Sequence, residues 1–291
     1  MRTDGGGVAA LVIADRVVSL PYAARLAGEG LNGVTDMISL MQQWNVVADA
    51  VRRVADRTQG LLTVGEVTGA ELTSLDAPIL RPGKVIAIGR NYAEHAAELG
   101  NKLPPEPMVF AKYSSSVIGP FDPIPRPRFV SDLDYEAELA VVIGTAGRDI
   151  AEADALDHVF GYCCANDVSA RTAQMATGQF IRGKSFDGFC PLGPAIVTRD
   201  EVADVQNLGI RCIVDGRTLQ DGSTTDMIFT VATLVAHCSA ATTLEPGDVI
   251  LTGTPSGVAM GRKPPPWLQP GQVCEVEIEG IGRLANPITA G

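Results

Sequence analysis

The sequence predicts a β-rich α+β fold, with a small N-terminal α+β domain followed by a larger domain built mainly from strands. Apolar strand-like segments, bounded by Gly and Pro turns, fill most of the chain after residue 79. Segments with helical spacing are fewer and do not alternate strictly with the strands, which argues against a doubly wound α/β fold. With 291 residues, of which 46% are hydrophobic, the chain is long enough to bury a substantial core.

The N-terminal domain is expected to span residues 1–78. Residues 8–20 alternate between apolar and polar side chains, which predicts a strand or a hairpin. Residues 36–57 predict an amphipathic helix, because apolar side chains recur at helical spacing: Ile38, Met41, Val47, Val51 and Val54. Residues 64–80 are typical of short, loop-like structure. The Arg-Pro-Gly sequence at 81–83 interrupts the chain before a new strand, so we place the domain boundary near residue 78.

The second domain, residues 79–291, is dominated by predicted strands. They are KVIAIG (84–89), PMVFAK (107–112), AELAVVIG (137–144), HVFGYCCAND (158–167), GPAIVT (193–198), LGIRCIVDG (208–216), DVILTGT (248–254) and QVCEVEIEG (272–280). Helices are predicted around Tyr92–Leu99, Ser169–Thr177 and Ile228–Ala241. Exposed strands of such a domain favour dimerisation.

The charge balance and the termini exclude several classes of protein. The chain has 34 acidic and 23 basic residues and a formal net charge of −11, with no basic stripe, so neither nucleic acid nor an anionic membrane is an expected partner. The N-terminal apolar run is too short to span a membrane and has no signal-peptide layout. The six cysteines form no C-x-x-C pair, which is typical of reduced core thiols. We therefore expect a soluble, cytoplasmic protein.

Acidic residues at alternate positions mark the start of one buried strand. In 133-LDYEAELAVVIG-144, Asp134, Glu136 and Glu138 lie on one strand face, which continues with Ala140 and Val142. Such carboxylates repel one another unless protons or a cation neutralise them. Magnesium prefers oxygen ligands, and Asp167, at the end of another apolar strand, is the candidate third ligand. The alternative is a solvated strand face without any ion.

A second candidate group lies in 89-GRNYAEHAAELG-100. His95 and Glu98 are three residues apart, so on a helix they share a face, and the carboxylate can orient the imidazole as a general base. The alternative is a surface ion pair. Arg90 and Tyr92, at the entry to this segment, are expected to contact a substrate. The other histidines, His158 and His237, are interpreted as structural.

Two further segments offer groups that bind anions. Lys184, in 179-QFIRGKSFDGFCPLGP-194, is surrounded by Gly, Phe and Pro residues, so its cation is a candidate partner for a substrate carboxylate or an enolate, although most lysines are merely solvated. In 248-DVILTGTPSGVAMG-261 a strand ends in a Gly-Thr-Pro turn, where backbone N–H groups and Thr254 can hold a carboxylate oxygen. Neither a Walker A loop nor a G-x-G-x-x-G motif is present, which excludes a classical nucleotide site.

Taken in order, these motifs resemble those of the fumarylacetoacetate hydrolase family from about residue 79 to the end. The matching stretches are GRNYAEHAAELG, MVFAKYSSSVIGPFDPI, DYEAELAVVIG, NDVSAR, GKSFDGFCPLGP and LTGTPSGV. The resemblance implies a catalytic domain formed by a mixed β-sheet roll or sandwich, and the residues before 79 look like the small N-terminal domain of many bacterial members. It also implies a homodimer.

The resemblance also assigns roles to residues. Glu136, Glu138 and Asp167 match the magnesium ligands, with Mn²⁺ or Ca²⁺ as alternatives. Asp134 matches no ligand and is expected at the rim of the site or directly behind the ligands. His95 and Glu98 match the general-base dyad on a mobile segment. Lys184 matches the lysine beside the metal, and Lys112 matches a basic residue that lines the pocket. The residues that match positions binding the substrate carboxylate are Arg171, Gln174 and Thr254. Thr172 and Ala259 depart from the family pattern and put the substrate in doubt.

The implied activity is Mg²⁺-dependent hydrolysis of a C–C bond in a small anionic 2,4-diketo acid, of the acylpyruvate, fumarylpyruvate or 2,4-diketo-3-deoxy sugar acid type. The products are pyruvate, or a related 2-keto acid, and a carboxylic acid. His95 would activate water, and Lys184 would add positive charge at the enolate. Oxaloacetate decarboxylation and isomerisation or hydration of an unsaturated 2-keto acid use the same enolate and remain alternatives. A non-catalytic metabolite-binding protein is a further alternative.

Overall fold

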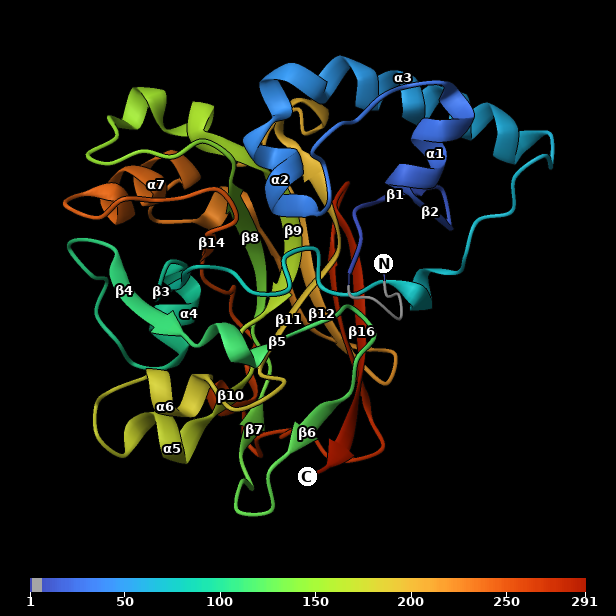
Figure 1. Ribbon diagram of the computed structural model, residues 1–291. Helices are drawn as coiled ribbons and strands as arrows, with labels where there is room; N and C mark the ends of the chain where they lie inside the picture. The colour runs from blue at the N-terminus through green and yellow to red at the C-terminus, as the bar shows by residue number, and fades with distance from the viewer. Residues whose placement is uncertain (2–6) are drawn as a thin grey trace.

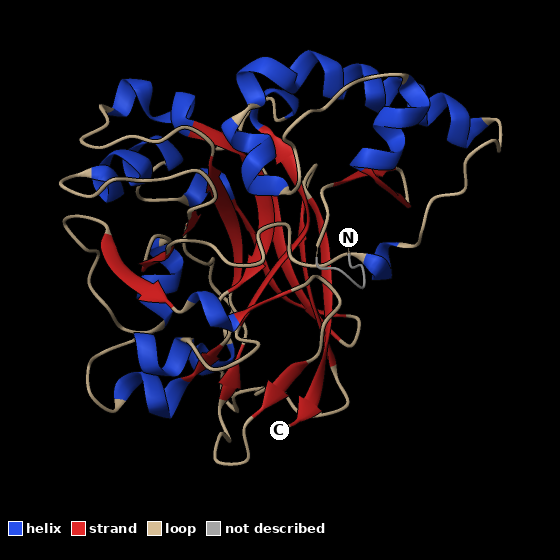
Figure 2. Ribbon diagram, viewed as in Figure 1, coloured by secondary structure: helices blue, strands red, loops and turns tan. Residues whose placement is uncertain are grey.

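Two β-sheets form the centre of the molecule. The computed structural model describes Met1 and residues 7–291, so residues 2–6 of the predicted N-terminal domain lie outside the described residues. The sheets lie at the centre, and most helices lie at the periphery (Figures 1 and 2). Parallel and antiparallel strand pairs occur in the same sheet. The predicted β-rich α+β class is therefore confirmed.

The seven-stranded sheet has the order β4-β3-β14-β8-β9-β11-β5. Its strands are β3 (Val85–Gly89), β4 (Met108–Lys112), β5 (Val117–Ile118), β8 (Ala137–Ile143), β9 (Val159–Asn166), β11 (Cys190–Thr198) and β14 (Val249–Leu251). The five-stranded sheet has the order β13-β12-β15-β16-β6. Its strands are β6 (Ile124–Arg126), β12 (Gly209–Val214), β13 (Arg217–Ser223), β15 (Val273–Ile278) and β16 (Gly282–Ala290).

Alternation along β8 separates two hydrophobic cores, as the sequence predicts. Leu139, Val141 and Ile143 belong to the core that also contains β12 and β15 side chains, whereas Ala140 and Val142 belong to the core on the opposite face. The predicted continuous strand from residue 133 is wrong, because β7 (Leu133–Asp134) pairs instead with β10 (Ser169–Ala170). Side-chain amides cause the break, since Asn166 Oδ1 accepts the N–H of residue 136 and Gln220 Oε1 that of residue 137.

Strand direction brings the candidate site residues to one edge of the seven-stranded sheet. β3 runs parallel to β14, β14 antiparallel to β8, and β8 antiparallel to β9. The carboxyl ends of β3, β14 and β9 therefore meet the amino end of β8 at the same edge. Four segments distant in the sequence contribute side chains there, namely those around Arg90, Thr254, Asp167 and Glu136.

The N-terminal segment has its own hydrophobic cluster, with members between Ala9 and Val67. Its elements are β1 (Ala10–Ile13), β2 (Arg16–Ser19), α1 (Leu20–Ala27), α2 (Met37–Gln42), α3 (Trp44–Thr63) and the 3₁₀ turn η1 (Leu72–Ser74). β1 and β2 confirm the predicted hairpin. Trp44 packs on Phe160 of β9 with ring centroids 5.0 Å apart, which ties this segment to the large sheet. The boundary near residue 78 stays a prediction.

The predicted single helix over 36–57 is wrong, since the chain forms two helices. Asp36 and Ser39 make a capping box that starts α2, and Gln43 leaves helical geometry at φ −105° and ψ 5°. The apolar spacing continues through Gln43, which is why periodicity alone hides the break. α3 also runs to Thr63, beyond the predicted end.

The remaining helices are short; three of them lie at the predicted positions, whereas the helix at Ile181–Lys184 was not predicted. They are α4 (Ala93–Glu98), α5 (Arg171–Met175), α6 (Ile181–Lys184) and α7 (Val231–Ser239). Further 3₁₀ turns are η2 (Ser114–Ser116), η3 (Glu152–His158), η4 (Arg199–Glu201), η5 (Thr224–Asp226) and η6 (Ala259–Gly261). Among the described residues, no helix has both the length and the apolar character needed to cross a membrane. All six cysteines are buried and free, as predicted.

Candidate metal centre

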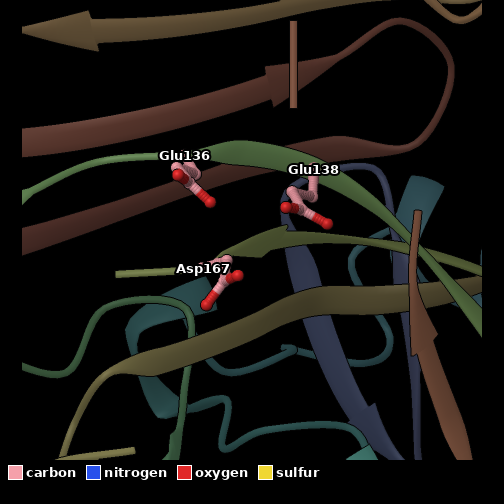
Figure 3. Close-up of side chains that lie close together, drawn as sticks. All are labelled: Glu136, Glu138 and Asp167. Carbon is pink, nitrogen blue, oxygen red and sulfur yellow. The ribbon is translucent and has the colours of Figure 1, made fainter. Parts of the chain in front are cut away.

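Three buried carboxylates converge at the edge of the large sheet (Figure 3). Glu136 precedes β8, Glu138 lies in its second position, and Asp167 follows the last residue of β9. One oxygen of each lies within 4.8 Å of the others. Their exposed fractions are 5%, 1% and 0%, respectively, which excludes the alternative of a solvated strand face.

Two buried lysines neutralise part of this charge. Lys184 Nζ donates to Glu136 Oε2 at 2.5 Å and to Asp167 Oδ2 at 2.7 Å. Lys112 Nζ donates to Asp167 Oδ1 at 2.6 Å and to the carbonyl of Lys184. Gly183 makes this arrangement feasible, because a Cβ at that position would collide with the backbone of α5.

Among the described residues, Glu138 is the one carboxylate of the three that forms no ion pair. Glu138 Oε2 accepts a hydrogen bond from the backbone N–H of Gly253 at 2.7 Å. Burial, followed by the negative charges of Asp167 and Glu136, raises the pKa of Glu138 well above its usual value. Burial also tends to raise the pKa of Glu136, but Lys184 and Arg171 outweigh it, so that this pKa is lowered. The oxygen-only donor set, with one carboxylate lacking a counter-charge, fits a hard divalent cation.

Asp134 is fully buried, so of its two expected positions the one at the rim is wrong and the one directly behind the carboxylate triad is confirmed. Its carboxylate accepts hydrogen bonds from Arg171 Nε at 2.8 Å and from the N–H groups of Ala259 and Met260 at 2.8 and 3.1 Å. Arg171 also contacts Glu136 Oε1 at 2.6 Å. The pair therefore links the carboxylate triad to the Gly-rich loop after β14. Asp134 and Ala259 are 125 residues apart in sequence, and no local pattern indicates this contact.

His95 and Glu98 form the predicted contact on α4. His95 Nδ1 lies 2.7 Å from Glu98 Oε1, and the backbone N–H of Gly257 donates to Glu98 Oε2 at 2.9 Å. A carboxylate without a proton only accepts hydrogen bonds, so in the neutral form of His95 this contact places the proton on Nδ1 and leaves a lone pair on Nε2. His95 is 6% exposed and lines the cavity beside the carboxylates.

The cavity has a volume of about 130 Å³. The predicted site residues that line it are Arg90, His95, Glu136, Glu138, Arg171, Gln174, Lys184 and Thr254. Its apolar wall was not predicted from the sequence and consists of Ile88, Leu99, Met108, Phe110, Met175, Phe180 and Met260. These residues come from strands, helical turns and loops that are distant in the sequence, so no local motif reveals them.

Several side chains that were predicted to bind the substrate are instead bonded to other groups of the protein or buried in its core. Lys112 does not line the cavity, because its ammonium group is bound to Asp167. Tyr92 is 1% exposed and belongs to the core between the sheets, where burial raises its pKa. Thr254 lines the cavity, but its hydroxyl donates to the carbonyl of Ala137 and accepts from Gln220 Nε2. Arg171 and Gln174 line the cavity and are bonded to each other at 2.9 Å.

The sequence and the fold match a known family. The model of the fumarylacetoacetate (FAA) hydrolase C-terminal domain matches residues 84–289, and the chain therefore belongs to the fumarylacetoacetate hydrolase family. Among its relatives, the mitochondrial oxaloacetate tautomerase of Xenopus laevis is 51% identical over 217 residues, which cover 74% of this chain and 68% of the relative.

Solved structures of the family are also similar. A fumarylacetoacetate hydrolase from psychrophilic Exiguobacterium antarcticum is 49% identical, with a TM-score of 0.69 over 74% of this chain and 78% of that one. A 2-hydroxyhepta-2,4-diene-1,7-dioate isomerase from Mycobacterium marinum is 40% identical, with a TM-score of 0.65 over 74% and 77% of the two chains. These relatives are named as a tautomerase, a hydrolase and an isomerase, so hydrolysis is one of several activities within the family.

Proposed function

We propose that the protein is a Mg²⁺-dependent enzyme that moves a proton between carbon and oxygen of a small 2-oxo acid, with oxaloacetate as the first substrate to test. The main observation that supports this proposal is that the buried carboxylate triad and the His95–Glu98 pair line or adjoin one small cavity. The names of two relatives, an oxaloacetate tautomerase and a dienedioate isomerase, support a reaction that rearranges a substrate without adding water.

Cavity size supports a small substrate. Pockets for drug-sized ligands usually measure about 300–1,000 Å³, whereas this cavity measures about 130 Å³. A four-carbon acid suits this volume better than a diketo acid with a long acyl tail.

In this proposal the acidic triad, Glu136, Glu138 and Asp167, holds the cation. A bound Mg²⁺ or Mn²⁺ would supply Lewis acidity that polarises the 2-oxo group and acidifies the neighbouring C–H bond. In the keto-to-enol direction His95 Nε2 takes the proton from carbon 3, and the resulting imidazolium donates it to the oxygen at carbon 2, which regenerates the imidazole. The enol-to-keto direction reverses these two transfers, and Glu98 stabilises the imidazolium in both. Lys184 contributes fixed positive charge beside the triad, where negative charge develops.

Hydrolysis of a 2,4-diketo acid is the second candidate. The observation that favours it is the same His95–Glu98 pair, which is equally suited to taking a proton from water. The two reactions share their enolate and differ in whether a C–C bond breaks. Decarboxylation of oxaloacetate is the third reaction with this enolate, and it needs no base to start.

The experiment is product analysis with chelator-stripped protein, with and without added Mg²⁺ or Mn²⁺, using oxaloacetate and acetylpyruvate. The proposal predicts metal-dependent conversion between enol and keto oxaloacetate, followed by ultraviolet absorbance, without release of CO₂. His95→Gln should lower this rate by about 10²–10⁴-fold and leave metal affinity nearly unchanged. Metal-dependent cleavage of acetylpyruvate to acetate and pyruvate would favour hydrolysis, and CO₂ release that survives His95→Gln would favour decarboxylation.

A further inference from the structure

One cationic side chain in the cavity lacks a counter-ion. Arg90, Arg171 and Lys184 line the cavity, and the latter two are each held by two buried carboxylates. Arg90 is half-buried, and across Met1 and residues 7–291 it has no hydrogen-bond or ion-pair partner. A partly desolvated guanidinium without an anion is a site ready to bind one.

The backbone of Arg90 is held in a defined conformation. Its φ of 58° lies in the left-handed region, which few residues other than glycine adopt and which recurs at functional sites. The next residue, Asn91, is 0% exposed and donates to the carbonyls of Phe229 and Thr252 at 3.0 and 2.8 Å. Its Oδ1 accepts the N–H of Phe229 at 2.8 Å. Arg90 is therefore held at the end of β3 by a rigid neighbour, although the conformation is unusual for arginine.

Arg90 and the acidic triad approach the cavity from different strands. β14 lies between β3 and β8, and neighbouring strands lie about 4.8 Å apart, so the two strands are separated by roughly 10 Å. A small acid bound at the triad by its 2-oxo acid end would extend towards Arg90. Apolar side chains, among them Met108, Phe110 and Phe180, make up much of the cavity wall, so a second carboxylate bound in the cavity needs a cationic partner.

We infer that Arg90 binds a second carboxylate of the substrate and makes the site selective for 2-oxo dicarboxylic acids over monocarboxylic acids with the same 2-oxo acid end. The inference rests on the proposed function for one point, that the 2-oxo acid end lies at the triad. Two relatives carry the names of dicarboxylates, oxaloacetate and a 1,7-dioate, and the same chemistry is consistent with their activities.

The test compares two acids that differ only at the far end. Malate and 2-hydroxybutanoate share the 2-hydroxy acid end, and malate has a carboxylate where the other has a methyl group. Neither has a ketone, so calorimetric titration of the Mg²⁺-loaded protein measures binding without turnover. Arg90→Gln should weaken malate binding by about 10- to 100-fold, the value of a charge-assisted hydrogen bond, and change 2-hydroxybutanoate binding by less than about twofold.

Two further variants complete the design. Arg90→Lys keeps the charge but loses the planar fork, so its loss of malate affinity should be smaller than that of Arg90→Gln. Arg217→Gln is the matched control, since Arg217 is an exposed residue of β13 in the other sheet and should leave both affinities unchanged. If Arg90→Gln fails to fold, Arg90→Lys against wild type carries the test.

The inference is overturned if wild-type protein binds the two acids equally, or if Arg90→Gln weakens both equally or neither. Failure of the proposed function looks different. Wild-type protein that leaves the enol–keto equilibration of oxaloacetate unaccelerated, yet prefers malate through Arg90, would refute the reaction and retain the dicarboxylate site. Rapid enolisation of oxaloacetate without any preference for malate would retain the proposed reaction and refute the dicarboxylate site.

Discussion

The buried pair of Asp134 and Arg171 predicts a large loss of stability for Asp134→Asn. Asp134 is 0% exposed, and both of its oxygens accept hydrogen bonds, from Arg171 and from the backbone N–H groups of Ala259 and Met260. In asparagine one oxygen becomes an NH₂ group, which faces donors and cannot accept from them. Arg171 would then keep Glu136 as its remaining carboxylate, at 2.6 Å.

The same chain provides a matched comparison at the surface. Removing one partner of a buried ion pair costs roughly 3–5 kcal/mol. Arg211 and Asp221 form an exposed pair at 2.9 Å, with side chains 51% and 63% exposed, and such pairs contribute about 0.2–1 kcal/mol. Asp134→Asn should therefore lower the free energy of unfolding by roughly 3–5 kcal/mol, and Asp221→Asn by less than about 1 kcal/mol.

Equilibrium unfolding in urea, with a chelator present, measures both changes. The chelator removes the contribution that a bound metal makes to the native state by mass action. Equal small changes in the two variants would refute the reasoning, because they would mean that burial of the pair does not matter. A change in the slope of unfolding free energy against urea, rather than in the midpoint, would equally contradict it.

Two other predictions follow from the site. The pKa of Glu138 is raised in the metal-free protein, so at pH values below this pKa the binding of a metal should release a proton. Metal affinity should therefore increase with pH across this range. A binding heat in calorimetry that does not depend on the ionisation enthalpy of the buffer would contradict this. Gly183→Ala should destabilise the protein by about 1–3 kcal/mol and weaken metal binding, because the new Cβ would collide with the backbone of α5. The control is Gly60→Ala, in an exposed turn of α3 with open space around it, which should stabilise the protein by about 0.5–1 kcal/mol. Urea unfolding measures both variants. A similar change in the free energy of unfolding for both would be evidence against the packing argument.

Local patterns were sufficient for part of the site. Glu136 and Glu138 were found because a strand places alternate side chains on one face, and the same alternation correctly divides Leu139 from Ala140. The contact between His95 and Glu98 follows from helical spacing. In each case the signal lies within a few residues of sequence, where geometry is fixed by one element.

Contacts between distant segments explain what the sequence did not reveal. Lys112 was expected to line the pocket, but its ammonium group instead forms an ion pair with Asp167, which is 55 residues away in the sequence. β16 was missed because Gly282 and Pro287 weaken the strand pattern, and pairing with β15 overrides this weakness. Buried pairing between strands or ions depends on the whole fold, and a single sequence read by local rules does not contain it.

The central claim is that the buried triad holds a divalent cation. The most direct measurement is Mn²⁺ titration of chelator-stripped wild type and of Glu138→Gln, followed by electron paramagnetic resonance of the free ion. Glu138 is the best position to change, because it accepts a hydrogen bond from a backbone N–H and, among Met1 and residues 7–291, no cationic side chain forms an ion pair with it. The account predicts saturable binding of a single Mn²⁺ per wild-type chain, weakened at least about tenfold in Glu138→Gln. Equal binding by both proteins, or no binding by wild type at millimolar Mn²⁺, would contradict it.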